Sequence, residues 1–233
     1  MIPKIIHNTG PSNRKIWPSE WHTCFASQKK HFKDYEFMFW DDDQMEEIVT
    51  KHFSFFKPTW DQYNHQILKA DMIRPMVLYL HGGIYLDLDM EVKEDVYHYL
   101  DPEKINLHGA RAGDKNHPEY TNAFMASTPR NPYWMKLLHQ ATNMWNSPVG
   151  DYFRNCGNNR RTWNLRCFKS IFRLTGPALL SYLPETNEQH ILNYGPFCLE
   201  CRNQPLRHIC TGSWWLKGKY ETGKIHHMGE IGK

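Results

Sequence analysis

Residues 82–89, with the sequence GGIYLDLD, constrain the fold of this chain more than any other stretch. They follow residues 62–81, whose apolar side chains recur at the spacing of an amphipathic helix, and a pair of glycines commonly stops such a helix. After the glycines, apolar and polar side chains alternate as they do in a strand. The stretch therefore predicts a helix, a glycine stop and a strand that ends in two carboxylates.

The two carboxylates, Asp87 and Asp89, are expected to share one face of this strand with Tyr85 and Glu91. Cα atoms two residues apart in a strand are separated by roughly 6.5 Å, so both side chains can reach one ion or one polar ligand. Like charges on one face repel unless a cation or hydrogen-bond donors satisfy them, and oxygen ligands suit Mg²⁺ or Mn²⁺. The pair therefore indicates a divalent metal that holds phosphate oxygens. The alternative interpretation is a solvated acidic turn.

A second pair of charged residues, Asp71 and Arg74, lies on the predicted helix just before the glycines. Because they are three positions apart, their side chains share one helix face, a short loop away from the acidic strand. Pro75 follows them and is predicted to kink the helix. The pair indicates a second part of the same site, and the alternative is a surface ion pair worth under about 1 kcal/mol.

Strand-like and helix-like segments alternate along the rest of the chain. We expect strands at residues 2–7, 35–40, 121–127, near 190–198 and near 207–211, and helices at residues 43–51, 132–145 and 177–183. Asp43 is predicted to cap the first of these helices, with Glu46 completing a capping box. Residues 101–118 are expected to form an irregular connection, and residues 146–169 a polar, basic stretch. This alternation predicts an α/β fold with a largely parallel sheet, whose ligands bind beyond the carboxyl ends of the strands.

Composition narrows the class of protein. The 233 residues carry 28 Lys and Arg against 25 Asp and Glu, a net charge of +3 that does not indicate a nucleic-acid partner. A hydrophobic fraction of 40% is enough for a sizeable core. No apolar run approaches the length of about 20 residues that spans a bilayer, and the first expected strand leaves no room for a signal peptide. We expect a cytoplasmic protein, and the oligomeric state stays open.

Six cysteines are scattered along the chain, and reduced thiols are expected in the cytoplasm. Cys198 and Cys201, followed by His208 and Cys210, also fit a zinc knuckle. A second Cys-x-x-Cys pair at the spacing of a zinc finger is missing, so zinc is the lesser alternative.

Several short blocks follow one another along almost the whole chain. They are IPKIIH at residues 2–7, YEFMFWDD at 35–42, ADxxR at 70–74, LYxxGGIYxDxD at 78–89, NAFMA at 122–126, TGP at 175–177 and GSW at 212–214. In this order they resemble the DXD-containing glycosyltransferases of the sugar-binding-region type. That family includes fungal α-1,6-mannosyltransferases, α-1,4-galactosyltransferases and bacterial capsule enzymes, and the glucosyltransferase domains of large bacterial toxins are more distant relatives.

The resemblance implies a GT-A fold, Rossmann-like, in a single domain over residues 1–233. Its nucleotide and metal half would cover about residues 1–100 and its acceptor half about residues 101–233. The implied reaction moves a hexose from a nucleotide-sugar to a hydroxyl of a glycan or glycoconjugate, with retention of anomeric configuration. We expect a UDP-hexose as the first choice of donor and GDP-mannose as the second, with Mn²⁺ or Mg²⁺ as the cofactor.

The resemblance also assigns the metal ligands. Asp89 is expected to coordinate the metal, and Asp87 the metal or the ribose. A late histidine is expected to complete the site, with His208, His226 and His227 as the candidates.

The same resemblance assigns the residues that hold the donor. Asp71 and Arg74 are expected to bind hydroxyls of the donor sugar, close to Asn122, because a guanidinium can hold two oxygens at once. Asp71, Arg74, Asp87, Asp89 and Asn122 form the implied catalytic set. The implied donor-binding set is His7, Thr9, Asp71, Arg74, Tyr85, Asp87, Ser213 and Trp214, with the last two in a lid over the diphosphate.

The chain departs from the family pattern at two positions. Gly10 stands where members of the family commonly have a tryptophan that stacks on the base, so Trp17 or Trp40 is expected to take that role. Pro75 stands where an aromatic residue is usual, next to Arg74.

Two other functions remain as alternatives. The sequence LDLDM around Asp87 is similar to a phosphohydrolase strand whose first aspartate is a nucleophile, although Glu91 replaces the small or hydroxyl residue usual there. The helix with Asp71 and Arg74 has no role in that chemistry. A non-catalytic module that binds a sugar nucleotide is the other alternative.

Overall fold

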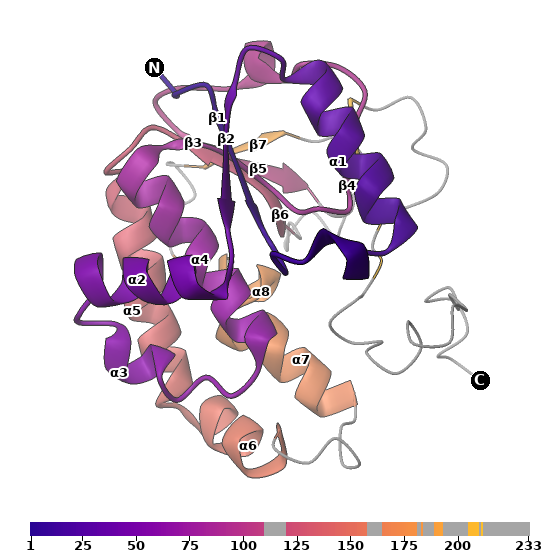
Figure 1. The fold of residues 1–233 in the computed structure, drawn as a ribbon. Helices are drawn as coiled ribbons and strands as arrows, with labels where there is room; N and C mark the ends of the chain where they lie inside the picture. The colour runs from indigo at the N-terminus through magenta and orange to yellow at the C-terminus, as the bar shows by residue number, and fades with distance from the viewer. Residues whose placement is uncertain are drawn as a thin grey trace.

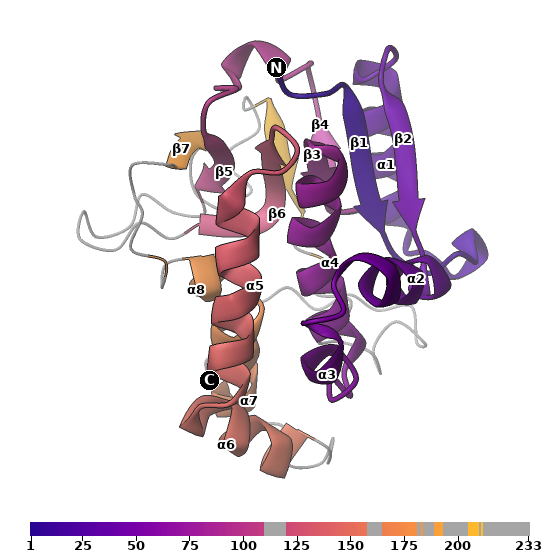
Figure 2. The same cartoon turned by 90° about the vertical axis from the view of Figure 1, so that its left-hand side faces the viewer.

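The fold centres on one sheet that joins strands from both ends of the chain. The structure, a computed structural model, describes residues 1–109, 120–157, 165–180, 183, 189–192, 205–209 and 211. Six strands of this part form the sheet, which Figure 1 shows nearly edge-on. Figure 2 shows their order: β2 (Glu36–Trp40), β1 (Ile5–Thr9), β3 (Gly83–Leu86), β6 (Tyr120–Ser127), β5 (Ile105–Gly109) and β7 (Gln189–Leu192). Among them only β6 is antiparallel to its neighbours. The prediction of an α/β fold with a mostly parallel sheet is confirmed.

Helices cover both faces of this sheet (Figure 2). On one face, Tyr85, Leu107 and Met125 pack into a core formed with the helices α2 to α8. On the other face, Ile84 and Leu86 pack with the end of α1 and with a small second sheet. The helices are α1 (Ser19–His31), α2 (Asp42–His52), α3 (Lys57–Trp60), α4 (Gln66–His81), α5 (Pro132–Trp145), α6 (Pro148–Gly157), α7 (Leu165–Leu174) and α8 (Pro177–Leu180), with 3-10 turns at Arg14–Ile16 and Tyr97–Tyr99.

The turn between α4 and β3 depends on its two glycines. Gly82 and Gly83 have φ values of +64° and +96°, which residues other than glycine rarely adopt. A Cβ on Gly83 would also lie 2.6 Å from the carbonyl oxygen of Ile5 on β1. The glycine stop is therefore as predicted, and it lets β3 begin in close contact with β1, where Ile84 pairs with Ile6.

The acidic motif does not continue the strand, contrary to the sequence prediction. β3 ends at Leu86, and residues 87–89 form a turn in which the amide of Met90 donates to the carbonyl of Asp87 at 3.1 Å. The next strand, β4 (Met90–Val92), belongs to a second sheet and pairs antiparallel with β8 (Leu206–His208). The expected alternation of faces therefore holds only as far as Leu86, because the chain leaves the first sheet at the motif.

Two other local predictions are corrected. β5 lies within residues 101–118, which were expected to be irregular. The polar, basic residues 146–169, for which no element was predicted, include α6 and the start of α7. The cap of helix α2 lies two residues earlier than predicted, because Asp41 and Gln44 form its capping box instead of Asp43 and Glu46. None of the described helices is long and apolar enough to cross a membrane.

The two aspartates at the start of α2 give a direct test of this cap. Replacing Asp41 by alanine removes the acceptor for the amide of Gln44, so we expect a loss of about 1 kcal/mol in the free energy of unfolding. Asp43→Ala is the matched control. It should lower the free energy of unfolding by only about 0.3 kcal/mol, because it removes a favourable interaction with the helix dipole. Urea denaturation of both variants measures the difference, and equal losses would contradict the assignment of Asp41 as the cap.

Candidate active site

Three potential metal ligands converge where β3 gives way to the second sheet. One ligand atom each from Asp87, Asp89 and His208 lies within 4.8 Å of the others. The pairing of β4 with β8 places His208 opposite Met90, directly beside the acidic turn. Nε2 of His208 lies 3.1 Å from Oδ1 of Asp89 and donates to it, because a carboxylate can only accept. The structure thus brings together the three residues that the sequence predicted as metal ligands.

Asp89 is held from both sides. Its Oδ2 accepts hydrogen bonds of 2.9 Å from the backbone amide and from the hydroxyl of Thr211, and its carbonyl accepts from the amide of Ile209. Burial opposes the charged form, but the interaction with His208 and the hydrogen bonds from His208 and Thr211 outweigh it and lower the pKa of Asp89 to about 2. Asp89 is therefore a carboxylate at neutral pH.

Arg74 connects this cluster with the helix α4. Its Nη2 lies 3.1 Å from Oδ1 of Asp87 and 3.3 Å from Oδ1 of Asp71. Its Nη1 donates to the carbonyl of Asn122 at 2.9 Å, and its Nε to the carbonyl of Ala70 at 3.2 Å. The side chain is only 6% exposed, so a buried cation joins the helix to the acidic turn.

Asp71 is bound by residues that are far away in the sequence. Its Oδ1 accepts from Nδ2 of Asn122 on β6 at 2.9 Å, and its Oδ2 accepts from the hydroxyl of Thr175 at 3.0 Å. Burial raises the pKa of Asp71 to about 6, although Arg74 and these hydrogen bonds favour the charged form. Asp71, Arg74, Asp87 and Asn122, all predicted as catalytic residues, form one contiguous network, in which Asp87 is partly exposed and the other three are buried.

Tyr85 completes this network from the strand β3. Its hydroxyl donates to Oδ1 of Asp87 at 2.8 Å, and its ring lies 5.0 Å from the guanidinium carbon of Arg74. Burial is also the main cause that raises the pKa of Asp87, against the influence of Arg74. Tyr85 thus contacts Asp87 and Arg74, and its expected place on the nucleotide side of the pocket stays a prediction.

His7 and Thr9 lie apart from the carboxylates, in contacts inside the sheet. Nδ1 of His7 accepts from the indole of Trp40 at 3.1 Å, so its Nε2 carries the hydrogen and donates to the carbonyl of Gly82 at 2.8 Å. The hydroxyl of Thr9 donates to the carbonyl of Trp40 at 2.8 Å. The structure gives both residues bonds that tie β1 to its neighbours, and their part in donor binding stays a prediction.

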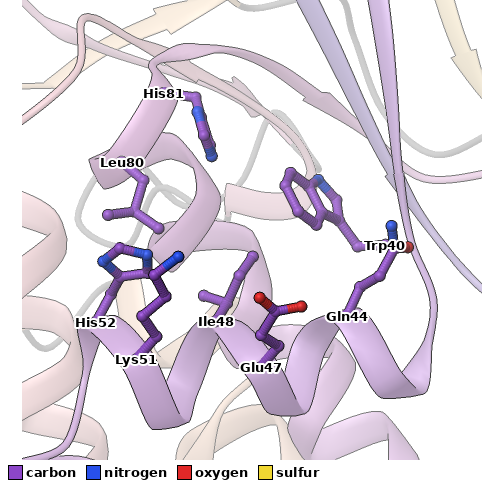
Figure 3. Close-up of a pocket in the computed structure, with 8 residues that line it drawn as sticks. All are labelled: Trp40, Gln44, Glu47, Ile48, Lys51, His52, Leu80 and His81. Atoms are coloured by element: carbon purple, nitrogen blue, oxygen red, sulfur yellow. The ribbon is translucent and has the colours of Figure 1, made fainter.

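The two candidates for the base-stacking tryptophan are both buried. Trp40 stacks on His7 and His81, and Figure 3 shows it lining a hollow between α2 and the end of α4. Trp17 packs against Phe25 and Phe39. Neither tryptophan lies in the network of the carboxylates.

Gly10 itself leaves no space for a larger side chain. A Cβ there would lie 2.7 Å from Cδ1 of Leu88, in the middle of the acidic motif. A tryptophan at this position would therefore require Leu88 to move.

Several predicted residues lie outside the described residues. These are Ser213, Trp214, His226, His227 and the three cysteines of the alternative zinc knuckle, Cys198, Cys201 and Cys210. His208, the remaining member of that knuckle, faces Asp89.

Sequence reasoning gave no role to two residues that bind the carboxylates. Thr175 was noted only within the TGP block, whose position in the sequence does not show that it meets Asp71. Thr211 carried no signal, because it reaches Asp89 only through the pairing of β4 with β8.

The fold and this site define a class: a mixed α/β protein with an acidic DXD motif directly after a central strand. Residues 18–108, which hold α4, the glycine stop and the acidic motif, match the family described as glycosyltransferase sugar-binding region containing DXD motif.

Two curated relatives extend the match along the chain. Mannosyl phosphorylinositol ceramide synthase CSH1 of Saccharomyces cerevisiae is 31% identical over 229 residues, which cover 94% of this chain and 54% of that protein. Inositol phosphoceramide mannosyltransferase 1 of Schizosaccharomyces pombe is 24% identical over 189 residues, which cover 78% of this chain and 50% of that protein. The chain therefore spans about half the length of these relatives.

Two solved structures share the fold. PaToxG glycosyltransferase has a TM-score of 0.53 at 17% identity, over 79% of this chain and 71% of that chain. The ligand-free glycosyltransferase domain from the YGT toxin has a TM-score of 0.50 at 9% identity, over 82% of this chain and 79% of that chain. The predicted GT-A type of fold is confirmed by this likeness.

The buried His7 predicts how stability depends on pH. Burial is the main cause that lowers the pKa of His7 in the folded chain from 6.5 to about 4. As the pH falls, the unfolded chain therefore binds the proton before the folded chain does. The contribution of neutral His7 to the free energy of unfolding is complete above pH 6.5 and is lost as the pH falls toward 4. Between pH 7 and pH 4.5, we expect the free energy of unfolding to fall by about 2 kcal/mol more in the wild type than in His7→Gln.

Urea denaturation at the two pH values measures this difference. The exposed His139 supplies a matched control, because His139→Gln leaves the hydrogen bonds of His7 in place and should keep the wild-type difference. A His7→Gln variant with the same pH dependence as the wild type would contradict the prediction.

Proposed function

We propose that this chain is a metal-dependent, retaining glycosyltransferase that moves a hexose from a nucleotide-sugar to a hydroxyl of a glycoconjugate. The observation that carries the proposal is the arrangement of two adjoining clusters. Asp87, Asp89 and His208 converge as potential metal ligands, and Arg74 joins Asp87 to the buried pair of Asp71 and Asn122. One cluster suits a diphosphate with its cation, and the other offers donors and acceptors for sugar hydroxyls.

The residues present fit a divalent cation. Two carboxylates and one imidazole are acceptable ligands for Mn²⁺, and Asp89 is charged at neutral pH. When bound, the cation would act as a Lewis acid that stabilises the negative charge on the departing diphosphate. Thr211 would keep Asp89 in place, since it donates two hydrogen bonds to the oxygen that His208 does not contact.

The second cluster supports a role in holding and orienting the donor sugar. Arg74 is fixed by four protein oxygens, and Asp71 by Asn122 and Thr175, so neither side chain has to be ordered when a ligand arrives. Preorganised polar groups of this kind lower the cost of reaching the transition state.

The hydrogen bonds of Asp71 also bear on the stereochemical course. Both of its carboxylate oxygens accept hydrogen bonds, and Arg74 lies beside one of them. These contacts favour a binding role over that of a nucleophile, which supports attack by the acceptor hydroxyl on the same face as the leaving group. Trapping of a covalent glycosyl adduct on the protein would overturn this part of the proposal.

The names of the relatives bear on the donor and the acceptor. Both relatives are described as enzymes of inositol phosphoceramide mannosylation, which supports a mannosyl donor ahead of a UDP-hexose. We therefore propose GDP-mannose as the first donor to test and a phosphoinositol-containing lipid as the first acceptor. UDP-hexoses remain in the test because the sequence resemblance favoured them.

The alternative of a phosphohydrolase receives less support. Its nucleophile would be Asp87, whose Oδ1 already accepts from the hydroxyl of Tyr85 and faces Arg74. The network around Asp71 would have no function in such an enzyme.

Replacing Asp89 by asparagine tests the proposal. We expect nucleotide release from the preferred donor to fall about a hundredfold or more, because the variant removes a charged metal ligand. The assay is run with GDP-mannose and a panel of UDP-hexoses, with Mn²⁺ or with a chelator. Asp43→Asn, an exposed carboxylate on α2, is the matched control and should retain full activity.

Three outcomes would contradict the proposal. Turnover that persists in the chelator would contradict the dependence on a metal. Full activity of Asp89→Asn would contradict the role of Asp89 as a metal ligand. Hydrolysis of simple phosphate esters without any glycosyl transfer would favour the phosphohydrolase.

A further inference from the structure

Two buried amide side chains hold the backbone of the acidic turn. Asn8 on β1 and Gln28 on α1 are 1% and 0% exposed. Nδ2 of Asn8 donates to the carbonyl of Leu86 at 2.8 Å and to Oε1 of Gln28 at 2.9 Å. Nε2 of Gln28 donates to the carbonyls of Asp87 and Met90, both at 3.0 Å. The four amide hydrogens of the pair are all used within one connected network.

These bonds begin where the sheet ladder stops. β1 and β3 pair through His7 and Tyr85, and the next residue of β1 is Asn8, whose side chain reaches the carbonyl of Leu86. From there the chain turns away toward the second sheet, so its carbonyls lose the partners that a strand would supply. The side chains of Asn8 and Gln28 supply donors to the carbonyls of Leu86, Asp87 and Met90, while the carbonyl of Asp89 accepts from the amide of Ile209.

The metal ligands depend on this turn for their position. Asp87 and Asp89 lie inside the segment whose carbonyls the pair holds, and Asp89 then meets His208. A free turn of five residues would let the two carboxylates separate, since their charges repel. The pair opposes that separation without contacting either carboxylate.

We propose that Asn8 and Gln28 are positioning residues that preorganise Asp87 and Asp89 for a divalent cation. The proposal rests on the proposed function for the identity of the ion, but its structural part concerns the order of residues 86–90 alone. Partners that fix metal ligands in this way typically change metal affinity by about tenfold to a hundredfold when they are removed.

The main test uses Gln28→Met, which removes both donated bonds without burying a charge. Asn8→Leu is the second variant, in case the first does not fold. The dissociation constant of Mn²⁺ is measured on the full chain by electron paramagnetic resonance, and hydrogen exchange reports on the backbone amides of residues 86–92 without metal. We expect the dissociation constant to rise about tenfold to a hundredfold in each variant, with faster exchange at residues 87–90.

Ser27→Ala is the matched control. Ser27 is the neighbour of Gln28 on α1, and its hydroxyl accepts a 2.9 Å hydrogen bond from the amide of Val92, just beyond the turn. This variant loses a bond between the same helix and β4, directly after the turn, so an effect of merely loosening the contact between α1 and this part of the chain should appear in it as well. We expect its Mn²⁺ affinity to stay within about twofold of the wild type, because no bond to residues 86–90 is lost.

The outcomes separate this proposal from the proposed function. Folded variants of Asn8 and Gln28 with wild-type Mn²⁺ affinity would overturn the positioning role while leaving the glycosyltransferase intact. A wild-type chain that neither binds Mn²⁺ nor releases nucleotide would overturn the proposed function. In that case exchange at residues 87–90 decides: faster exchange in Gln28→Met than in Ser27→Ala supports the positioning role, and equal exchange overturns it.

Discussion

The candidate site depends on one buried interaction, the guanidinium of Arg74 between the carboxylates of Asp71 and Asp87. Two carboxylates cannot remain close together in a protein interior unless a cation and hydrogen-bond donors compensate their charge. Arg74 supplies the cation and also binds the carbonyls of Ala70 and Asn122, so α4, β6 and the end of β3 meet at one side chain. Removing that charge would leave the buried Asp71 and the partly exposed Asp87 without their shared cation.

The acidic motif itself is held by elements from opposite ends of the chain. The motif begins directly after β3 of the central sheet, and Asn8 and Gln28 donate hydrogen bonds to its backbone carbonyls. His208 on β8 and Thr211 after it contact the side chain of Asp89. A rigid turn is useful at a metal site because ligands that are already in place lose little conformational freedom on binding. The same segment thus ends one sheet, begins another and carries the charges.

Local sequence patterns predicted much of the fold and the part of the site that is formed by α4 and β3. The glycine stop, the helix face with Asp71 and Arg74, and the alternation through Leu86 follow from short-range geometry, and they agree with the structure. The turn at residues 87–89 was not predicted, because its polar alternation resembles that of a strand. The contacts of Thr175, Thr211 and Gln28 depend on pairings between distant segments, for which a single sequence carries no signal.

The central claim is that Asp87, Asp89 and His208 hold the cation that binds the diphosphate of the donor. Crystals of the chain grown with Mn²⁺ and GDP or UDP test it most directly, because the anomalous scattering of manganese locates the ion without reference to activity. The account predicts one peak in contact with Asp87, Asp89 and His208 and with the diphosphate oxygens. A manganese peak at another group of residues, or nucleotide bound with no manganese at these three, would contradict it.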